Sequence, residues 1–128
     1  MNAASSPSPR PLAGLRILLA EDSWHLAMAL RQTLEHAGAT IAGIASTVAH
    51  AERLSRSARF EAAVMDLNLH DEMTTSVISR LARNGIKVVV ISGYDLAPEL
   101  AEQVHASFGK PAPGDDLVKA LQAPLRQT

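Results

Sequence analysis

Short apolar runs alternate with helical patterns along this chain. Five apolar runs predict strands, at residues 15–20, 40–45, 60–65, 86–91 and 104–108. The fourth run is rich in β-branched residues and shows no polar alternation, which is typical of a central parallel strand covered on both faces. After the first run, Leu26, Leu30 and Leu34 recur every four positions and predict an amphipathic helix that ends near Gly38.

Local signals predict four further helices. Thr47 and Asp115 are suited to cap the second and the last helix, because their side-chain oxygens can accept hydrogen bonds from a first helical turn. The third helix should end at Asn84 or Gly85, which tolerate a left-handed backbone, and a short helix is expected at residues 98–102. The inward-facing residues expected on the longer helices are Val48, Ala51, Leu54, Val77, Ile78, Leu81, Leu117, Val118 and Leu121.

Five strand–helix units with short joints predict one α/β domain with a doubly wound, five-stranded parallel sheet, a (βα)5 flavodoxin-like fold. A length of 128 residues suits a single core. We expect that domain at residues 15–123. Residues 1–14 are rich in Ser, Pro and Ala and have no apolar stretch, so they predict a disordered tail and not a signal peptide.

Composition narrows the function classes. Twelve Lys and Arg against thirteen Asp and Glu leave no basic excess, which argues against nucleic acid as a partner. No apolar run reaches the ~18 residues that a membrane span needs, so no membrane association is expected. The chain has no Cys, which excludes disulfides and thiolate metal sites and fits a cytoplasmic protein. The five His residues show no zinc-binding spacing.

Reactive side chains follow the ends of four predicted strands: Glu21, Asp22, Asp66, Ser92 and Lys110. In doubly wound sheets the ligand site lies at the carboxyl ends of the strands. Three carboxylates gathered there repel one another unless a cation lies between them. Lys110 is one candidate and Mg²⁺ another. Mg²⁺ would be held by Asp22 and Asp66, with the backbone carbonyl of Asn68 as a third ligand and Glu21 acting through water.

A carboxylate beside Mg²⁺ and a lysine is arranged to accept a phosphoryl group, because cations offset the charge on the equatorial oxygens. The Ser92 hydroxyl can donate to one of those oxygens, and Gly93 leaves the approach open. These observations predict phosphoryl transfer to a carboxylate, with Ser92 and Lys110 assisting.

Four motifs, in order, resemble the receiver domain of bacterial response regulators: "ED", "MDLNL", "ISGY" and "GKP". The match runs over residues 15–121. The resemblance implies strand order 2-1-3-4-5, Asp66 as phosphoacceptor, Glu21 and Asp22 as the acidic pair, Ser92 as the hydroxyl and Lys110 as the lysine. It also implies Mg²⁺ as cofactor, a sensor histidine kinase or a phosphotransfer protein as phosphodonor, and a cis bond before Pro111.

The chain departs from the receiver pattern at three places. His70 stands where most receivers have Pro, and Ser107 stands where an aromatic switch residue is usual, with Phe108 one position later. The segment between Ser92 and Lys110 is also short. In these respects the chain resembles atypical, single-domain receivers that work with HWE-family kinases, and Tyr94 is the candidate replacement switch.

The sequence therefore predicts a stand-alone receiver, not an enzyme beyond self-catalysed phosphoryl transfer and dephosphorylation. Its output would be a protein–protein contact or the removal of phosphoryl groups from a kinase. One alternative is a degenerate receiver that binds partners without phosphorylation. A flavodoxin-like cofactor binder is a weaker alternative, since its phosphate site needs a hydroxyl- and Gly-rich loop where "AEDSWHL" places two acids. An Asp-nucleophile phosphatase would need a DxD pair after the first strand, and none is present.

Overall fold

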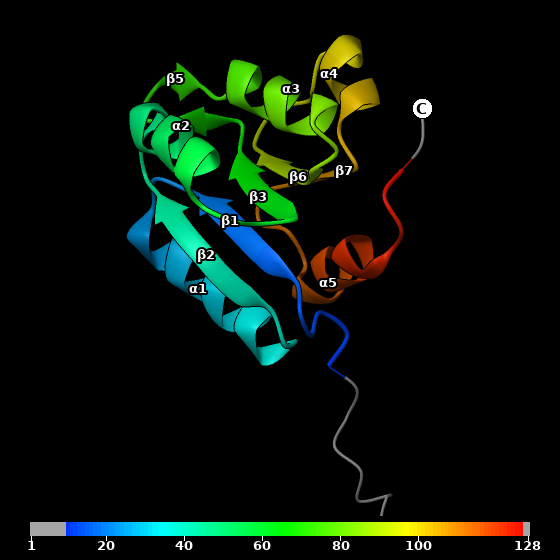
Figure 1. The fold of residues 1–128 in the computed structure, drawn as a ribbon. Helices are drawn as coiled ribbons and strands as arrows, with labels where there is room; N and C mark the ends of the chain where they lie inside the picture. Colours follow the sequence, from blue (N-terminus) through cyan, green and yellow to red (C-terminus); the bar gives the residue numbers. More distant parts are fainter. Residues whose placement is uncertain (1–9, 127–128) are drawn as a thin grey trace, which may run out of the picture.

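Five parallel strands form one central sheet in the computed structural model, which describes residues 10–126. Their order is β2-β1-β3-β6-β7, so the sheet is wound in both directions from β1 (Figure 1). A two-stranded antiparallel hairpin, β4 with β5, follows β3 directly. With that hairpin set aside, the order is 2-1-3-4-5, and the predicted fold class is confirmed. The strands are β1 (Arg16–Ala20), β2 (Thr40–Ala45), β3 (Ala62–Asp66), β4 (Asn68–Leu69), β5 (Glu72–Met73), β6 (Lys87–Ser92) and β7 (Ala106–Gly109).

Five helices cover the two faces of the sheet (Figure 1). Residues of α1 and α5 share one half of the core, and residues of α2, α3 and α4 share the other half. The helices are α1 (Trp24–His36), α2 (Val48–Ser57), α3 (Thr75–Arg83), α4 (Pro98–Gln103) and α5 (Gly114–Gln122). None of these helices is long and apolar enough to cross a lipid bilayer.

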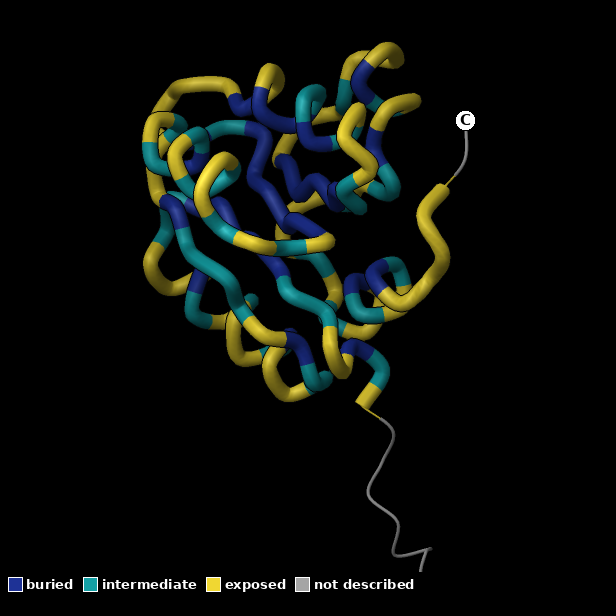
Figure 2. Tube along the Cα trace, viewed as in Figure 1, coloured by how far each residue is buried: buried dark blue, intermediate teal, exposed yellow. Residues whose placement is uncertain are grey.

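The strands β1, β3 and β6 form the centre of the core, where the tube in Figure 2 is almost continuously dark blue. Alternate residues of each strand point to opposite halves, as Val88 and Val90 do against Val89 and Ile91. Because helices cover both faces, both sets are apolar. This is the environment that the β-branched run of the fourth predicted strand indicated.

The helix ends confirm one predicted cap and correct another. The Thr47 side chain accepts a hydrogen bond from the His50 N–H at 3.1 Å, as expected. Gly85, with φ +81, takes the left-handed position after α3. Asp115 does not cap α5, so that prediction was wrong. Pro113 lies in an extended conformation and makes Gly114 the first helical residue, which leaves Asp115 inside the first turn.

The packed part of the chain begins earlier than the expected boundary at Leu15. Leu12 is 2% exposed and packs into the α1–α5 half of the core, and its N–H donates to the Ala37 carbonyl at 2.9 Å. Gly38, with φ +106, lies against the backbone of Ala13, and a Cβ at Gly38 would come within 3.0 Å of the Ala13 nitrogen. Residues 1–9, the rest of the predicted tail, lie outside the described residues.

Candidate functional site

The parallel sheet gathers the five predicted site residues at one edge. Asp66 and Ser92 are the last residues of the neighbouring strands β3 and β6, Glu21 and Asp22 follow β1, and Lys110 follows β7. Carboxylate oxygens of Glu21, Asp22 and Asp66 all lie within 4.8 Å of one another. Glu21 and Asp66 are buried and Asp22 is half-buried, so the cluster is a largely desolvated set of three acids.

The Lys110 ammonium bridges two of these acids. Its Nζ lies 2.5 Å from Asp66 Oδ2 and 3.2 Å from Glu21 Oε1. Burial acts to lower the pKa of Lys110, but the hydrogen bonds and charges of Asp66 and Glu21 outweigh it and raise this pKa. Lys110 therefore stays charged and offsets part of the repulsion in the cluster.

Each carboxylate also accepts one backbone N–H. Ser23 donates to Glu21 Oε2 at 2.9 Å, and Asn68 donates to Asp66 Oδ1 at 3.1 Å. His70 donates to Asp22 Oδ2 at 2.8 Å from the tip of the β4–β5 hairpin. These donors fix the orientation of the side chains, because backbone groups held by secondary structure cannot rotate as side chains do.

Adjacent acids in this cluster differ in their proton affinity. Burial raises the pKa of Glu21, the Asp66 charge adds to the rise, and the Ser23 N–H partly opposes it. The hydrogen bond from the His70 N–H is the largest cause of a lowered pKa at Asp22. Asp22 therefore stays ionised more readily than Glu21, because burial works against the charge on Glu21.

The donor set fits a hard divalent cation. All three side chains offer carboxylate oxygens, the ligands that Mg²⁺ and Ca²⁺ prefer, and one ammonium does not neutralise three carboxylates. Asp22 and Asp66 would hold such an ion, with Glu21 beside them. Asn68 reaches the site through its backbone N–H, and its carbonyl remains the predicted third ligand.

Ser92 lies at the edge of this cluster and is buried, with 3% of its surface exposed. Its Oγ accepts the Tyr94 N–H at 2.9 Å, and its carbonyl accepts the Lys110 N–H at 3.1 Å. Gly93 has no heavy atom within 4 Å of the place a Cβ would take, so the approach to the hydroxyl is open. The Lys110–Pro111 bond is cis, as predicted.

Two aromatic residues near the site are largely exposed. Tyr94, the candidate switch, is 75% exposed, and Trp24 at the start of α1 is 69% exposed, so solvent covers most of both residues. Ser107 is exposed and pairs with Val90, whereas Phe108 pairs with Ile91 and packs into the α1–α5 half of the core. Strand alternation thus leaves no aromatic side chain on the α4 side of β7.

Two groups that hold the site in place were not predicted from the sequence pattern. The backbone N–H of His70 is one. The other is Thr74, which is fully buried and donates from Oγ1 to the carbonyl oxygens of Asp66 at 2.8 Å and Leu67 at 3.0 Å. Thr74 anchors the backbone that carries Asp66. Only the position of a Thr just before α3 could have suggested it.

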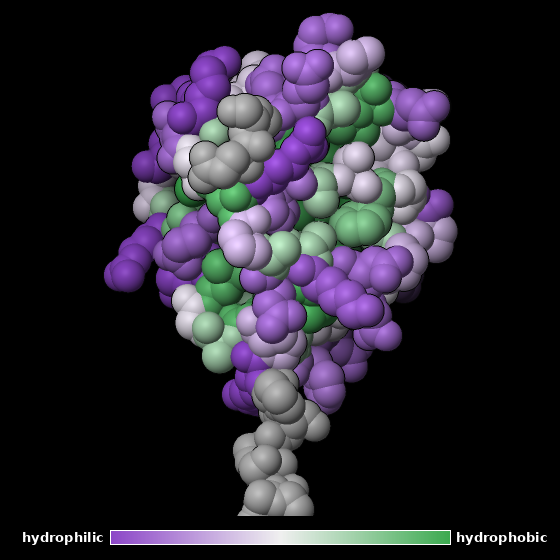
Figure 3. All heavy atoms as spheres, turned by 90° about the vertical axis from the view of Figure 1, so that its right-hand side faces the viewer, coloured by the Kyte–Doolittle hydropathy of each residue, from purple (hydrophilic) through white to green (hydrophobic). Residues whose placement is uncertain are grey.

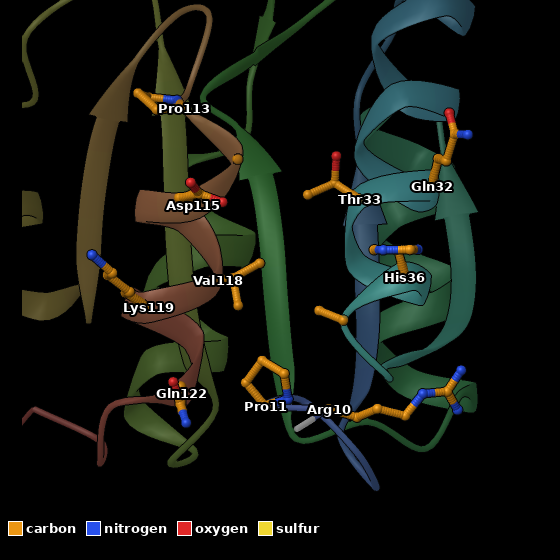
Figure 4. A pocket seen from close by; sticks show the side chains of 12 residues that line it. Arg10, Pro11, Gln32, Thr33, His36, Pro113, Asp115, Val118, Lys119 and Gln122 are labelled. Atoms are coloured by element: carbon orange, nitrogen blue, oxygen red, sulfur yellow. The ribbon is translucent and has the colours of Figure 1, made fainter. Parts of the chain in front are cut away.

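One wide groove lies away from the acids. It has a volume of about 1070 Å³ and lies between α1 and α5, where Arg10, His36, Asp115 and Lys119 line it (Figure 4). A cavity of about 140 Å³ does touch the cluster, between Glu21, Lys110 and the apolar side of α1. The reactive groups therefore form a small polar site at the sheet edge and not a deep pocket.

Solved structures with the same fold carry a response-regulator name. A CheY-like response regulator receiver domain from Methylobacillus flagellatus matches with a TM-score of 0.74 and 24% identity, over 84% of this chain and 96% of that chain. This chain has the receiver fold. SdrG from Sphingomonas melonis Fr1 matches with a TM-score of 0.73 and 31% identity, over 84% of this chain and 92% of that chain. That identity over nearly the whole of SdrG places the two chains in one family.

A third receiver-fold match carries chemistry in its description. It is a response regulator from Burkholderia pseudomallei with a phosphorylated aspartic acid, a calcium ion and citrate. Its TM-score is 0.72 at 24% identity, over 84% of this chain and 66% of that chain. No family model matches the sequence of this chain, and no curated protein matches it. The motifs at the strand ends are therefore the main sequence evidence for the site.

Proposed function

We propose that this chain is a response regulator receiver that accepts a phosphoryl group on Asp66 from a histidine kinase or a phosphotransfer protein. The observation that carries the proposal is the environment of Asp66. Lys110 Nζ lies 2.5 Å from one carboxylate oxygen, the Asn68 N–H holds the other, and the Glu21 and Asp22 carboxylates lie beside it. The phosphorylated aspartic acid of the Burkholderia pseudomallei regulator, on the same fold, supports this reading.

The residues present account for each requirement of the transfer. An Asp66 oxygen forms the new P–O bond while the bond from phosphorus to the donor nitrogen breaks, and the electron pair stays with the leaving imidazole. Lys110 moves from the carboxylate to a phosphoryl oxygen, and Ser92 Oγ, which accepts the Tyr94 N–H, still has its own proton to donate to another. Asp22 and Asp66 would hold Mg²⁺, which would offset the remaining negative charge.

Transmission would run through the segment after Ser92. Because the Tyr94 N–H binds Ser92 Oγ, a shift of that hydroxyl toward a phosphoryl oxygen acts directly on the backbone of Tyr94. Tyr94 is therefore the proposed switch, and α4, β7 and α5 form the proposed partner surface. Figure 3 shows this side of the molecule, with apolar patches among hydrophilic side chains. The phosphorylated protein would then contact a protein partner, or it would serve as a phosphate sink. We place it in the cytoplasm, with a kinase of the HWE family as its phosphodonor.

The arrangement disfavours the alternatives. A flavodoxin-like phosphate site would have to form where Glu21 and Asp22 place two carboxylates, one of them buried. A degenerate receiver has no need of the Lys110–Asp66 pair, which is intact here.

Intact mass after incubation with Mg²⁺ and a small-molecule phosphodonor tests the proposal. Wild type should gain one phosphoryl group, Asp66→Ala should gain none, and Asp71→Asn, an exposed acid of the nearby hairpin tip, should behave as wild type. An unmodified wild type would favour the degenerate receiver. Modification of Asp66→Ala to the wild-type extent would remove Asp66 from its role.

A further inference from the structure

Asp22 is held differently from the two other acids. Lys110 pairs with Glu21 and Asp66, and within the described chain it makes no ion pair with Asp22. Asp22 Oδ2 instead accepts the backbone N–H of His70 at 2.8 Å, from a residue 48 positions later. The imidazole is not this donor, since its Nδ1 lies 3.9 Å from the same oxygen and the side chain is 60% exposed.

An unusual backbone directs that N–H toward the acids. His70 and Asp71 have φ values of 50 and 65, in the left-handed region that non-glycine residues rarely adopt. They form the two-residue tip between the paired residues Leu69 and Glu72, as in a tight hairpin turn. Asn68 Oδ1 accepts the Asp71 N–H at 3.0 Å and closes the turn. Strained positions of this kind persist only where surrounding contacts hold them, and they concentrate at functional sites.

We propose that the His70 backbone N–H is a positioning group for Asp22, which holds one carboxylate oxygen and leaves the other directed at the cation. The inference rests on the proposed function, because it assigns a part of its Mg²⁺ site. Proline, the residue of the receiver pattern at this position, has no N–H and cannot make this contact.

Mg²⁺ dissociation constants from ¹H–¹⁵N NMR titrations test the role with two substitutions at one position. His70→Gly keeps the N–H and accepts the positive φ freely. His70→Pro removes the N–H. The Gly variant should bind Mg²⁺ within about twofold of wild type, whereas the Pro variant should bind roughly tenfold or more weakly, as expected when a carboxylate loses a hydrogen bond.

A third variant separates the donor from the shape of the turn, and it replaces the Pro variant if that one does not fold. Incorporation of the α-hydroxy analogue of histidine at position 70 exchanges the N–H for an oxygen without restricting φ. It should weaken Mg²⁺ binding as the Pro variant does. If the variant with this ester bond at position 70 binds Mg²⁺ as tightly as wild type, the inference is overturned. So would an affinity in His70→Gly as weak as in His70→Pro, since the imidazole would then be responsible.

The phosphorylation assay on the same wild-type protein separates this inference from the proposed function. If the Mg²⁺ affinities follow the expected order but Asp66 is never phosphorylated, the positioning role stands and the proposed function fails. If Asp66 is phosphorylated and all variants bind Mg²⁺ equally, the positioning role alone fails. A wild type that binds no Mg²⁺ at millimolar concentration would also overturn the role of His70.

Discussion

The two sides of the site at the sheet edge are built very differently. On the acid side, Glu21, Asp22 and Asp66 each accept a backbone N–H, and Lys110 bridges two of them. On the other side, which follows Ser92, every residue from Gly93 to Glu99 except Leu96 is exposed. α4 has only six residues and no side-chain hydrogen bond at its N-terminus, and Leu100 is its buried residue.

This difference suggests that the acid side carries out the chemistry and that the segment after Ser92 changes conformation in response. The groups that would hold the cation and take the phosphoryl group are fixed before the reaction, so little ordering is left to be done at the acceptor. The segment that would report the reaction has few buried anchors, and segments of this kind open at low free-energy cost. Changes on the acid side should therefore alter stability and chemistry, whereas changes after Ser92 should alter only the response.

Lys110→Met should have the largest effect on the acid side. Without the ammonium, Asp66 and Glu21 face each other unneutralised, and we expect the metal-free protein to lose about 2 kcal/mol of unfolding free energy at pH 7. Because the pKa of Lys110 is raised in the folded state, the stabilisation is complete below its unfolded value, ~10.4, and is lost as the pH rises through the folded value. Urea denaturation of both proteins between pH 7 and 11 measures the loss of stability at pH 7 and its dependence on pH.

Lys119→Met, at an exposed position of α5, is the matched control and should change stability by less than about 0.5 kcal/mol. The Lys110→Met fold should be unchanged by circular dichroism, and its response to beryllofluoride, a phosphoryl mimic, should disappear. Equal stability of wild type and Lys110→Met at pH 7 without metal would contradict the bridging role.

Glu21→Gln should have a smaller effect of opposite sign. Burial raises the pKa of Glu21, so its charged form is disfavoured in the folded state. The contribution of Glu21 to the free energy of unfolding is therefore complete below its unfolded pKa, ~4.3. It is lost as the pH rises through the pKa of the folded state. Above that window, metal-free Glu21→Gln should be more stable than wild type by up to about 1 kcal/mol.

The two proteins should converge below that window, and millimolar Mg²⁺ should remove the advantage of Glu21→Gln, because wild type gains more from the cation. Thermal melts across pH 4 to 8, with and without Mg²⁺, measure this. Glu72→Gln, at an exposed residue of β5, should track wild type throughout. A Glu21→Gln protein less stable than wild type at neutral pH without metal would show that the pair with Lys110 outweighs the burial of the charge.

Tyr94→Ala should have the smallest effect on stability. With 75% of the residue exposed, removal of its ring should change the unfolding free energy by less than about 0.5 kcal/mol. If Tyr94 is the switch, the chemical-shift response of α4 to beryllofluoride should nevertheless shrink. Asp95→Asn, at an exposed position next to Tyr94, is the neighbouring control and should keep both stability and response. An unchanged response in Tyr94→Ala would exclude the switch role.

The same contrast explains what the sequence could and could not predict. Asp66, Ser92 and Lys110 were found because strand ends are visible in apolar runs, and parallel strands bring their carboxyl ends to one edge. The His70 N–H was not found, because a backbone donor leaves no mark in residue type. Its direction depends on positive φ values at two residues that are not glycine.

Two other errors have the same origin in local geometry. Composition assigned residues up to 14 to a tail, but one leucine, Leu12, has a buried position at the end of α1 and brings its neighbours into the fold. Asp115 has the chemistry of a cap, yet Pro113 takes the cap position and α5 starts two residues too early for Asp115 to cap it. Residue type indicated the chemistry of each side chain, but the backbone conformation determined its position and its contacts.

Amide hydrogen exchange with and without beryllofluoride and Mg²⁺ tests the division between the two sides most directly. We expect the Asn68 and His70 amides to be protected in both states, because each already donates to a carboxylate. Amides of residues 94–103 should exchange rapidly in the free protein and slow markedly when the phosphoryl mimic binds. Equal exchange at 94–103 in both states, or unprotected Asn68 and His70 amides in the free protein, would contradict a preassembled acceptor coupled to a segment that orders on phosphorylation.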